Sequence, residues 1–381
     1  MIEYIVSAIR LRLAPHVIKL WKKKEKKTMK KGLKVTLIIL AVILLLLAAL
    51  VGLAYGYYVS KLDQLQTDPT RDPNETLSPS EMSELNTNPL GSEMEDLVGN
   101  LPQVIPTFPN LDKPDERPEY LDHVTNVLLI GTDERSAEFT NKARGDTCML
   151  LSINTAGDSP VVSLIGFERG MGMPILSGKY AGQWDWLTHL FRYGGAEMMM
   201  ESIEACFDIE VDYYVRVNFS TFTTGIDTLG GVDVEFTSKE AEYFQKYYDF
   251  DAVVGKNHLD GVHALRYARL RQIDSDWKRI ERQRKIIASA ISKVKDKNLA
   301  ELDALVDTCT KLVRTNLTQS VITKLLLDVA PGLGNVQVQQ MTIPVKGTYG
   351  SHKVMGDRSA FAPDFEENTR LLHEMIYGLS K

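Results

Sequence analysis

Cysteine is scarce in this sequence, and no internal repeat is present. Only Cys148, Cys206 and Cys309 occur among 381 residues, with no C-x-x-C pair and no metal-ligand spacing. A disulfide framework is therefore not expected. Repeat architectures are not expected either, because they need self-similarity at a fixed period.

Positive charge is scarce beyond residue 34. Residues 1–34 carry eleven Lys and Arg against two acidic residues, a net of +9, so the chain total of −6 leaves −15 for residues 35–381. An acidic body does not neutralise a phosphodiester backbone, so we expect no nucleic-acid partner. The overall composition, 44% hydrophobic and 25% charged, is typical of a globular protein with one or two domains.

Charge is absent altogether from residues 35–60. As a helix this stretch is roughly 39 Å long, enough for the ~30 Å hydrocarbon core, and we predict a transmembrane helix at 35–59. A buried helix of a soluble protein is rarely apolar on every face, and a cleaved signal peptide has a shorter apolar run. Because the basic residues precede the span, residues 1–34 are predicted to be cytoplasmic and the rest extracytoplasmic, on a cell membrane crossed once.

Proline is concentrated between residues 61 and 120, which hold nine of the fifteen prolines. With few aromatics and many polar residues, this composition cannot bury enough apolar surface to order itself. We therefore predict an extracytoplasmic linker at 60–120, with a small loop-rich domain as the alternative.

Residues 121–381 alternate between strand and helix patterns. Such interleaving predicts an α/β fold: a three-layer domain with a mixed central sheet flanked by helices, preceded by the transmembrane helix. The expected strands are 124–131, 147–154, 161–167, 212–219, 231–236 and 335–344, and the expected helices are 195–207, 219–229, most of 259–327, and 364–379.

A first candidate site consists of Asp133, Arg144 and Asp146. Asp133 follows one predicted strand and Asp146 comes just before the next, so both carboxylates can meet at one rim if these strands are neighbours in the sheet. Carboxylate oxygens are the ligands that hard cations such as Mg²⁺ prefer. The alternative is a pair of turn-capping aspartates with a solvated arginine.

A second candidate site is the arginine-rich segment LRYARLR followed by DSDWKRIERQRK. Arg279, Arg282 and Gln283 are spaced i, i+3 and i+4 and share one face of a predicted helix. Arginine forks near a helix N-terminus bind phosphate, and together with Arg269 and Arg271 they predict an anion site. The alternative is a solvated basic face. With a metal ion bound at the first site, the two candidate sites together could hold one pyrophosphate group.

These motifs together resemble the LytR–CpsA–Psr family of cell-wall glycopolymer transferases. The resemblance runs from about Asn126 to Lys293 and is carried by NVLLIGTDER, ARGDTCMLLSIN, DYYVRVNFSTFTTGIDTLGGVDV, HLDGVHALRYARLR and DWKRIERQRK, in the order of the family. The closing DFEENTRLLHEMIYG is also similar. Several ordered motifs over this length are far more specific than a single short motif.

The resemblance implies a membrane-anchored phosphotransferase. Members of the family move a glycopolymer, such as a teichoic acid or capsule, from a polyprenyl-pyrophosphate carrier to peptidoglycan, with the prenyl tail in an apolar tunnel between sheet and helices. It implies Mg²⁺ (or Mn²⁺) on Asp133 and Asp146. We expect Asp133, Asp146, Arg169 and Arg271 to be catalytic, and Arg144, Arg269, Arg271, Arg279, Arg282 and Gln283 to bind the pyrophosphate.

Two positions depart from the pattern of the family. Its Pro-Arg-Asp turn reads Glu168-Arg169-Gly170 here, and a lysine expected to face the phosphate is Trp186. The second departure predicts a weakened substrate site, unless Arg192 or Lys179 restores the charge. An alternative function is therefore a degenerate member that binds lipid-linked glycan or peptidoglycan without turnover. A regulator that binds DNA is disfavoured, because 34 cytoplasmic residues are too few for such a domain.

Overall fold

The structure is a computed structural model that describes residues 56–68, 75–87, 97–105 and 122–378, except 137, 158, 296 and 330–334. The predicted cytoplasmic segment, and the predicted span except for residues 56–59, lie outside this part of the chain. Within it, no helix is both long and apolar enough to cross a membrane. From Lys61 onward the chain forms one compact unit.

A mixed six-stranded sheet forms the middle layer of this unit. β1 pairs antiparallel with β2 and parallel with β6, while β2 pairs antiparallel with β3. Beyond β3 lies the parallel β10, and beyond β6 the antiparallel β9. In spatial order the strands are β10 (Gln337–Ile343), β3 (Val161–Phe167), β2 (Gly145–Asn154), β1 (Val124–Thr132), β6 (Tyr213–Val217) and β9 (Arg314–Thr315).

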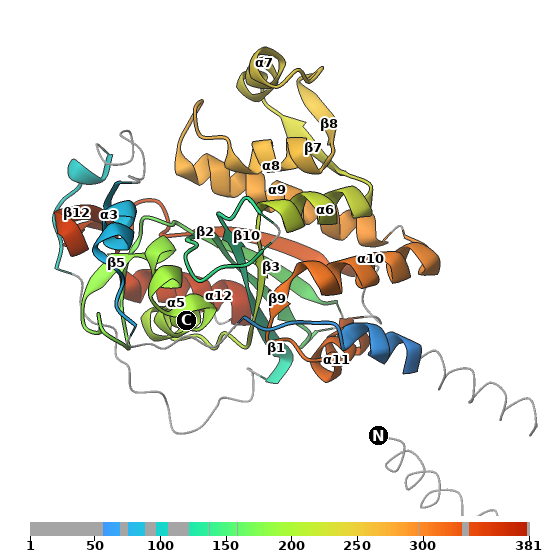
Figure 1. Ribbon diagram of the computed structural model, residues 1–381, viewed down its shortest axis with the longest axis horizontal. Helices are drawn as coiled ribbons and strands as arrows, with labels where there is room; N and C mark the ends of the chain where they lie inside the picture. The colour runs from blue at the N-terminus through green and yellow to red at the C-terminus, as the bar shows by residue number, and fades with distance from the viewer. Residues whose placement is uncertain are drawn as a thin grey trace, which may run out of the picture. The chain divides into compact units, whose positions relative to one another are not determined.

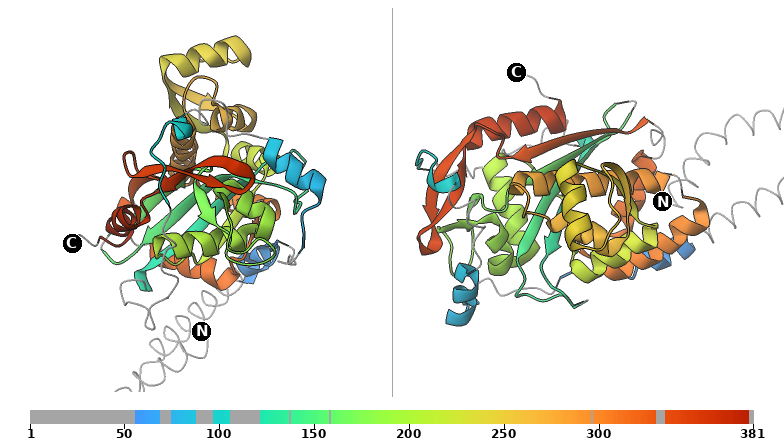
Figure 2. Two further views of the ribbon diagram at one scale, coloured as in Figure 1. Left: turned by 90° about the vertical axis from the view of Figure 1, so that its left-hand side faces the viewer. Right: turned by 90° about the horizontal axis from the view of Figure 1, so that it is seen from above.

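Helices cover both faces of the sheet (Figures 1 and 2). One face carries α5 and α12, and the other carries α9 with α6 and α8 packed beside it. This confirms the predicted three-layer α/β domain with a mixed sheet. The helix bounds are α5 (Leu187–Phe207), α6 (Phe219–Leu229), α8 (Gly261–Arg269), α9 (Asp276–Lys295), α10 (Leu299–Leu312), α11 (Gln319–Val329) and α12 (Phe365–Tyr377).

The core explains why the central strands are apolar along their whole length. Because both faces of the sheet are covered, side chains of either direction are buried: Leu164 and Ile165, neighbours on β3 that point to opposite faces, have no exposed surface. Gly166 of β3 lets α9 approach closely, since a Cβ at that position would lie 2.2 Å from Cγ2 of Ile280. This close packing fixes the first turns of α9 over the sheet.

Three two-stranded ribbons complete the unit. Only β7 among their strands is expected from the sequence, because the others are short or carry polar residues that hide the strand pattern. Their bounds are β4 (Gly172–Pro174) with β5 (Trp184–Trp186), β7 (Val232–Phe236) with β8 (Gly255–Leu259), and β11 (Tyr349–Val354) with β12 (Arg358–Pro363); α7 (Ser238–Tyr247) joins β7 to β8, and the 3₁₀ turn η3 (Met355–Asp357) joins β11 to β12.

The predicted linker at 60–120 needs correction, because its described stretches pack on the domain. It contains a helix, α3 (Pro79–Thr87), and residues from three separate stretches are buried: Leu62 and Leu85 at 3% and 2% exposure, and Val98 at 0%. Gln66 also bridges to Arg314 of β9. Single apolar residues in a polar, proline-rich stretch are enough to dock it, although the average composition of the stretch does not reveal them.

Candidate functional site

Two acidic residues flank the hairpin connection between β1 and β2. β1 ends at Thr132, which lies opposite Gly145 of β2, and the register shifts between Gly131 and Thr132. Such an irregularity re-aims side chains at a strand end. Asp133 therefore begins the connecting loop and Asp146 is the second residue of β2. Both lie at the same end of the sheet, as their spacing predicted.

Asp133 is held by Arg144 across the base of this loop. The backbone N–H of Arg144 donates to Oδ1 of Asp133 at 3.0 Å, and its Nε donates to Oδ2 at 3.1 Å. Nη2 of Arg144 completes the ion pair with Oδ2 at 2.5 Å. These bonds close the loop and fix the direction of both side chains.

Asp146 lies among cations. Nη1 of Arg169 donates to its Oδ1 at 3.4 Å, and Oγ1 of Thr188 donates to the same oxygen at 3.2 Å. Burial raises the pKa of Asp146, but the charges of Arg169, Arg279 and Arg144 outweigh burial and leave the pKa below its ordinary value. The carboxylate is therefore ionised at neutral pH.

Three guanidinium groups are gathered around Asp146 and Asp276. Asp276, at the start of α9, accepts from Nη2 of Arg279 at 2.8 Å and lies 3.5 Å from Nε of Arg169. Arg271 is exposed overall, but its guanidinium group is partly desolvated. This desolvation, together with the charges of Arg169 and Arg279, lowers the pKa of Arg271 to about 10. Like-charge crowding of this kind favours a bound anion.

Glu168 is a buried acid behind this cluster, and sequence reasoning noted its position without its role. It has no exposed surface and shares a hydrogen bond with the carboxylate of Asp276. Burial and the neighbouring Asp276 charge raise the pKa of Glu168 well above its ordinary value. We therefore assign the proton to Glu168, which donates to the ionised Asp276.

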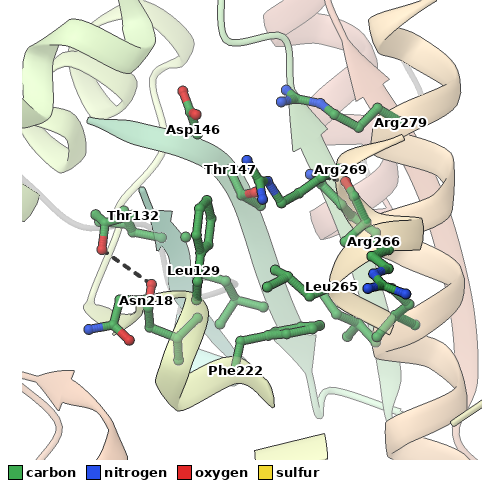
Figure 3. A pocket seen from close by; sticks show the side chains of 18 of the residues that line it. Leu129, Thr132, Asp146, Thr147, Asn218, Phe222, Leu265, Arg266, Arg269 and Arg279 are labelled. Atoms are coloured by element: carbon green, nitrogen blue, oxygen red, sulfur yellow. Dashed lines mark hydrogen bonds between the residues drawn. The ribbon is translucent and has the colours of Figure 1, made fainter. Parts of the chain in front are cut away.

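A cavity of about 450 Å³ opens between the sheet and α6, α8 and α9 (Figure 3). Asp146 and Arg279 lie at one end of the view and Phe222 at the other. The capping box of Asn218 and Thr221 begins α6 and places its first turn against the cavity. The polar end is lined by Asp146, Arg269, Arg271, Arg279 and Gln283, and the apolar lining includes Leu129, Val215, Phe219, Phe222, Leu265, Ile286 and Ile287.

Gln283 lines this cavity, but the expectation that Arg282 shares the same site needs correction. Arg282 is 2% exposed, and its guanidinium is bound by the carboxylates of Glu240 and Asp274 and by the carbonyl of Leu270. It does not line the cavity. Helical spacing alone placed Arg282 beside Arg279, but its two carboxylate partners turn its head group away.

Trp186 also lies elsewhere than the resemblance implies. Its indole is 1% exposed, donates from Nε1 to the carbonyl of Ser359 at 3.0 Å and packs under Arg358 at 4.7 Å. Trp186 lines neither the cavity in Figure 3 nor a smaller cavity beside Asp133. Arg192 is buried in an ion pair with Glu81 at 3.3 Å, and Lys179 is exposed. The departure at 186 therefore replaces a cation with a core residue.

The residues fit the predicted metal only in part. Within the described chain, no group of three or more His, Cys, Asp or Glu is arranged to hold a metal ion. Mg²⁺, however, is commonly held by one or two carboxylates, with substrate phosphate and water completing the shell. Asp133 and Asp146 supply that number of carboxylates, and Asp146 is held in its ionised form. The donor set is therefore suitable for a metal that arrives with a phosphate.

Comparisons with known proteins identify relatives of this chain. TagU of Halalkalibacterium halodurans, a polyisoprenyl-teichoic acid–peptidoglycan teichoic acid transferase, is 31% identical over 227 residues, covering 58% of this chain and 70% of the relative. TagU of Bacillus subtilis is 31% identical over 196 residues, covering 51% and 60%. A structure of TagT bound to LI-WTA is 25% identical with a TM-score of 0.54, covering 70% of this chain and 95% of TagT.

A family model agrees with the fold and with these relatives. The model of the LytR_cpsA_psr family matches residues 110–371, which include the whole sheet, the cavity and the arginine cluster. The match covers well over half of the chain. This protein belongs to the LytR_cpsA_psr family.

Proposed function

We propose that this chain transfers a glycopolymer phosphate from a polyprenyl-pyrophosphate carrier to a hydroxyl group of peptidoglycan. The observation that supports this most directly is the cavity with two unlike ends, one bearing arginines around Asp146 and the other mainly apolar, with Arg266 beside Leu265. A prenyl pyrophosphate has the same division. The names of the TagU relatives describe transfer of teichoic acid to peptidoglycan, the same class of reaction.

The polar end binds and orients the pyrophosphate. Arg271 and Arg279 supply charge, and Nε of Arg279 is buried without a hydrogen-bond partner in the described part of the protein. Arg269 packs on the ring of Phe219 at 4.3 Å, which holds its guanidinium at the boundary between the two ends. Charge-assisted contacts of this kind each contribute about 1.5–3 kcal/mol.

In the transfer, the acceptor hydroxyl oxygen forms a bond to the phosphorus that carries the glycan. The bond between that phosphorus and the bridging oxygen of the carrier breaks, and polyprenyl phosphate leaves with the electron pair. The hydroxyl proton passes to water. Phosphoryl transfer of this type depends on positioning and charge stabilisation, which the arginines provide.

A bound Mg²⁺ would neutralise charge on the pyrophosphate, and Asp133 and Asp146 are the residues that would hold it. Arg169 and Thr188 keep the Asp146 carboxylate oriented toward the polar end through hydrogen bonds to Oδ1. Arg144 does the same for Asp133. These contacts orient both carboxylates without any ligand.

The two departures from the family pattern do not remove charge from this cavity. Arg169 keeps its contact with Asp146, and Trp186 lines no part of the site. No observation therefore favours binding without turnover. We further propose that the predicted span anchors the catalytic unit on the outer side of the membrane, which external protease acting on intact protoplasts would check by releasing an acidic fragment.

The experiment is transfer of labelled glycan from a polyprenyl-pyrophosphate donor to peptidoglycan by the full chain. We expect Asp146→Asn to lower the rate by about 10²–10³, a typical loss for one electrostatic group of the transition state. Asp233→Asn is the matched control, since Asp233 pairs with Lys256 and His258 on the β7–β8 ribbon. Full activity of Asp146→Asn, or donor binding by the parent without transfer, would contradict the proposal.

A further inference from the structure

A second cavity, of about 190 Å³, lies beside Asp133. Its walls come from three parts of the chain: the loop between β1 and β2, the end of α3, and Arg192 of α5. Arg192 is 4% exposed, so a buried cation forms part of the wall. We call this space the polar cavity and the one in Figure 3 the lipid cavity.

Helix α3 is what makes this space concave. Leu85 anchors α3 in the hydrophobic core. One turn earlier, Glu81 lies 3.3 Å from Nη2 of Arg192 and 3.3 Å from Nζ of Lys142. Hydrogen bonds from Ser78, with these cations, lower the pKa of Glu81 to about 2, so it is ionised at neutral pH. The wall is therefore held by both apolar burial and ion pairs.

The linings of the two cavities adjoin along the chain at the ends of two paired strands. On β1, residues 129–132 line the lipid cavity, and residues 133 and 134, which follow β1, line the polar cavity. On β2, residues 146 and 147 line the lipid cavity, and residues 142–144, which precede β2, line the polar cavity. Asp133 therefore belongs to the lining of one cavity and Asp146 to the lining of the other.

The lining of the polar cavity is balanced in charge. Glu84, Asp133 and Glu134 carry negative charge, while Lys142, Arg144 and Arg192 carry positive charge. There is no excess of cations for a phosphate, in contrast to the polar end of the lipid cavity. Closely mixed donors and acceptors, with some apolar surface from Leu85 and Ala143, suit an uncharged group rich in hydroxyls, which is the chemistry of a sugar.

We propose that the polar cavity binds a sugar of the acceptor glycan strand. This inference rests on the proposed function. In phosphoryl transfer, the attacking and leaving oxygens are roughly in line. Because the leaving polyprenyl phosphate is directed into the lipid cavity, the attacking hydroxyl must arrive from the other side of the two carboxylates. The polar cavity is the space that begins there, and α3 forms its outer wall.

The test measures binding of soluble peptidoglycan strands to the full chain in detergent by isothermal titration calorimetry. Glu84→Trp should fill the polar cavity, and because the Glu84 side chain is 73% exposed the fold should tolerate it. We expect the dissociation constant for the strands to rise at least about tenfold, the loss of a few polar contacts. Affinity for a polyprenyl pyrophosphate should not change. Ser83→Trp, an exposed neighbour outside the cavity, is the control.

A second variant changes a residue on the opposite wall of the polar cavity. Lys142→Trp should reproduce the effect, because the Lys142 side chain is 75% exposed and lines the same space. Ser136→Trp, on the same loop but outside the cavity, should not. The proposal is overturned if both tryptophan variants bind the strands as the parent does. It is also overturned if they weaken donor binding equally, because the cavity would then hold the glycan of the donor.

These outcomes separate the inference from the proposed function. Loss of strand binding in both variants, in a protein that shows no transfer, would support the sugar site and count against the transferase. Efficient transfer that is insensitive to both variants would leave the transferase intact and reject the sugar site.

Discussion

Two buried arginines in the described part of the protein, Arg282 and Arg216, differ from the arginines around Asp146 in the number of carboxylates available per guanidinium. Arg282 is bound by Glu240 and Asp274, and Arg216 is bound by Asp68 and Glu134. Each of these guanidiniums also donates to a backbone carbonyl. Each therefore has at least two negative partners and joins parts of the chain that are distant in sequence.

The three arginines around Asp146 share two carboxylates, and Arg169 contacts both of them. Arg169, Arg271 and Arg279 cluster near two ionised carboxylates, those of Asp146 and Asp276. Three cations near two anions leave positive charge that a phosphate can satisfy. The number of carboxylates per guanidinium therefore distinguishes an anion site from a structural ion pair, whereas the arginine content of a segment does not.

The sharpest test of this comparison is Arg282→Ala. Removing the Arg282 guanidinium leaves the carboxylates of Glu240 and Asp274 without their cationic partner. Loss of one partner of a buried ion pair costs about 3–5 kcal/mol in stability. We expect the free energy of unfolding, measured with denaturant, to fall by that amount. Lys278→Ala, an exposed pair with Glu281 on the same helix, should change it by less than about 0.5 kcal/mol. Equal effects would remove the distinction between the two groups.

Trp186→Lys tests how much a buried cation without a carboxylate partner of its own destabilises the fold. The neighbouring acid, Asp185, already accepts from Arg358 and Tyr193 and contacts His189. We expect a loss of about 3 kcal/mol in stability from the lost packing and the uncompensated charge. Thermal unfolding measures this, with Trp186→Phe as the milder control. A stable lysine variant with faster transfer would instead restore the expectation that position 186 serves the phosphate.

Arg271→Ala should separate binding from stability. Removing a cation from a crowded cluster relieves repulsion, so stability should be unchanged or slightly higher. Affinity for a polyprenyl pyrophosphate should fall by about 1.5–3 kcal/mol, the contribution of one charge-assisted contact. Arg370→Ala, an exposed arginine paired with Glu367 on α12, provides the matched control for affinity. Unaltered affinity in Arg271→Ala would place the pyrophosphate elsewhere.

The smallest expected effect concerns Glu168. Its pKa is raised in the folded state, so above about pH 4.5 the unfolded chain loses the proton that the folded chain keeps. Stability should therefore fall as pH rises from that value to the folded pKa. Glu168→Gln, which can still donate to Asp276, should lack this slope and gain about 1.4 kcal/mol relative to the parent for each pH unit between about pH 4.5 and the folded pKa of Glu168. Parallel melting curves for the two proteins across that range would show that Glu168 is ionised when folded.

Much of the fold can be predicted from the sequence because local patterns carry it. Apolar runs such as 124–131 and 147–154 match β1 and β2 within a few residues, and the closing helix matches α12. The β11–β12 ribbon is missed because its residues show no clear alternation. The packing of α3 is missed because it depends on a few side chains, such as Leu85 and Glu81, in a polar stretch.

The candidate site, like the fold, could be predicted from the sequence only in part. The sequence by itself determined that Asp133 follows one predicted strand and that Asp146 comes just before the next, and that arginines gather at the start of a helix. Only the tertiary structure decided which of these arginines stay available to a phosphate. The partner Glu240 lies 42 residues before Arg282, and Asp146 lies more than a hundred residues before Arg271. Charge neutralisation depends on distance in space, which the fold sets and sequence spacing does not.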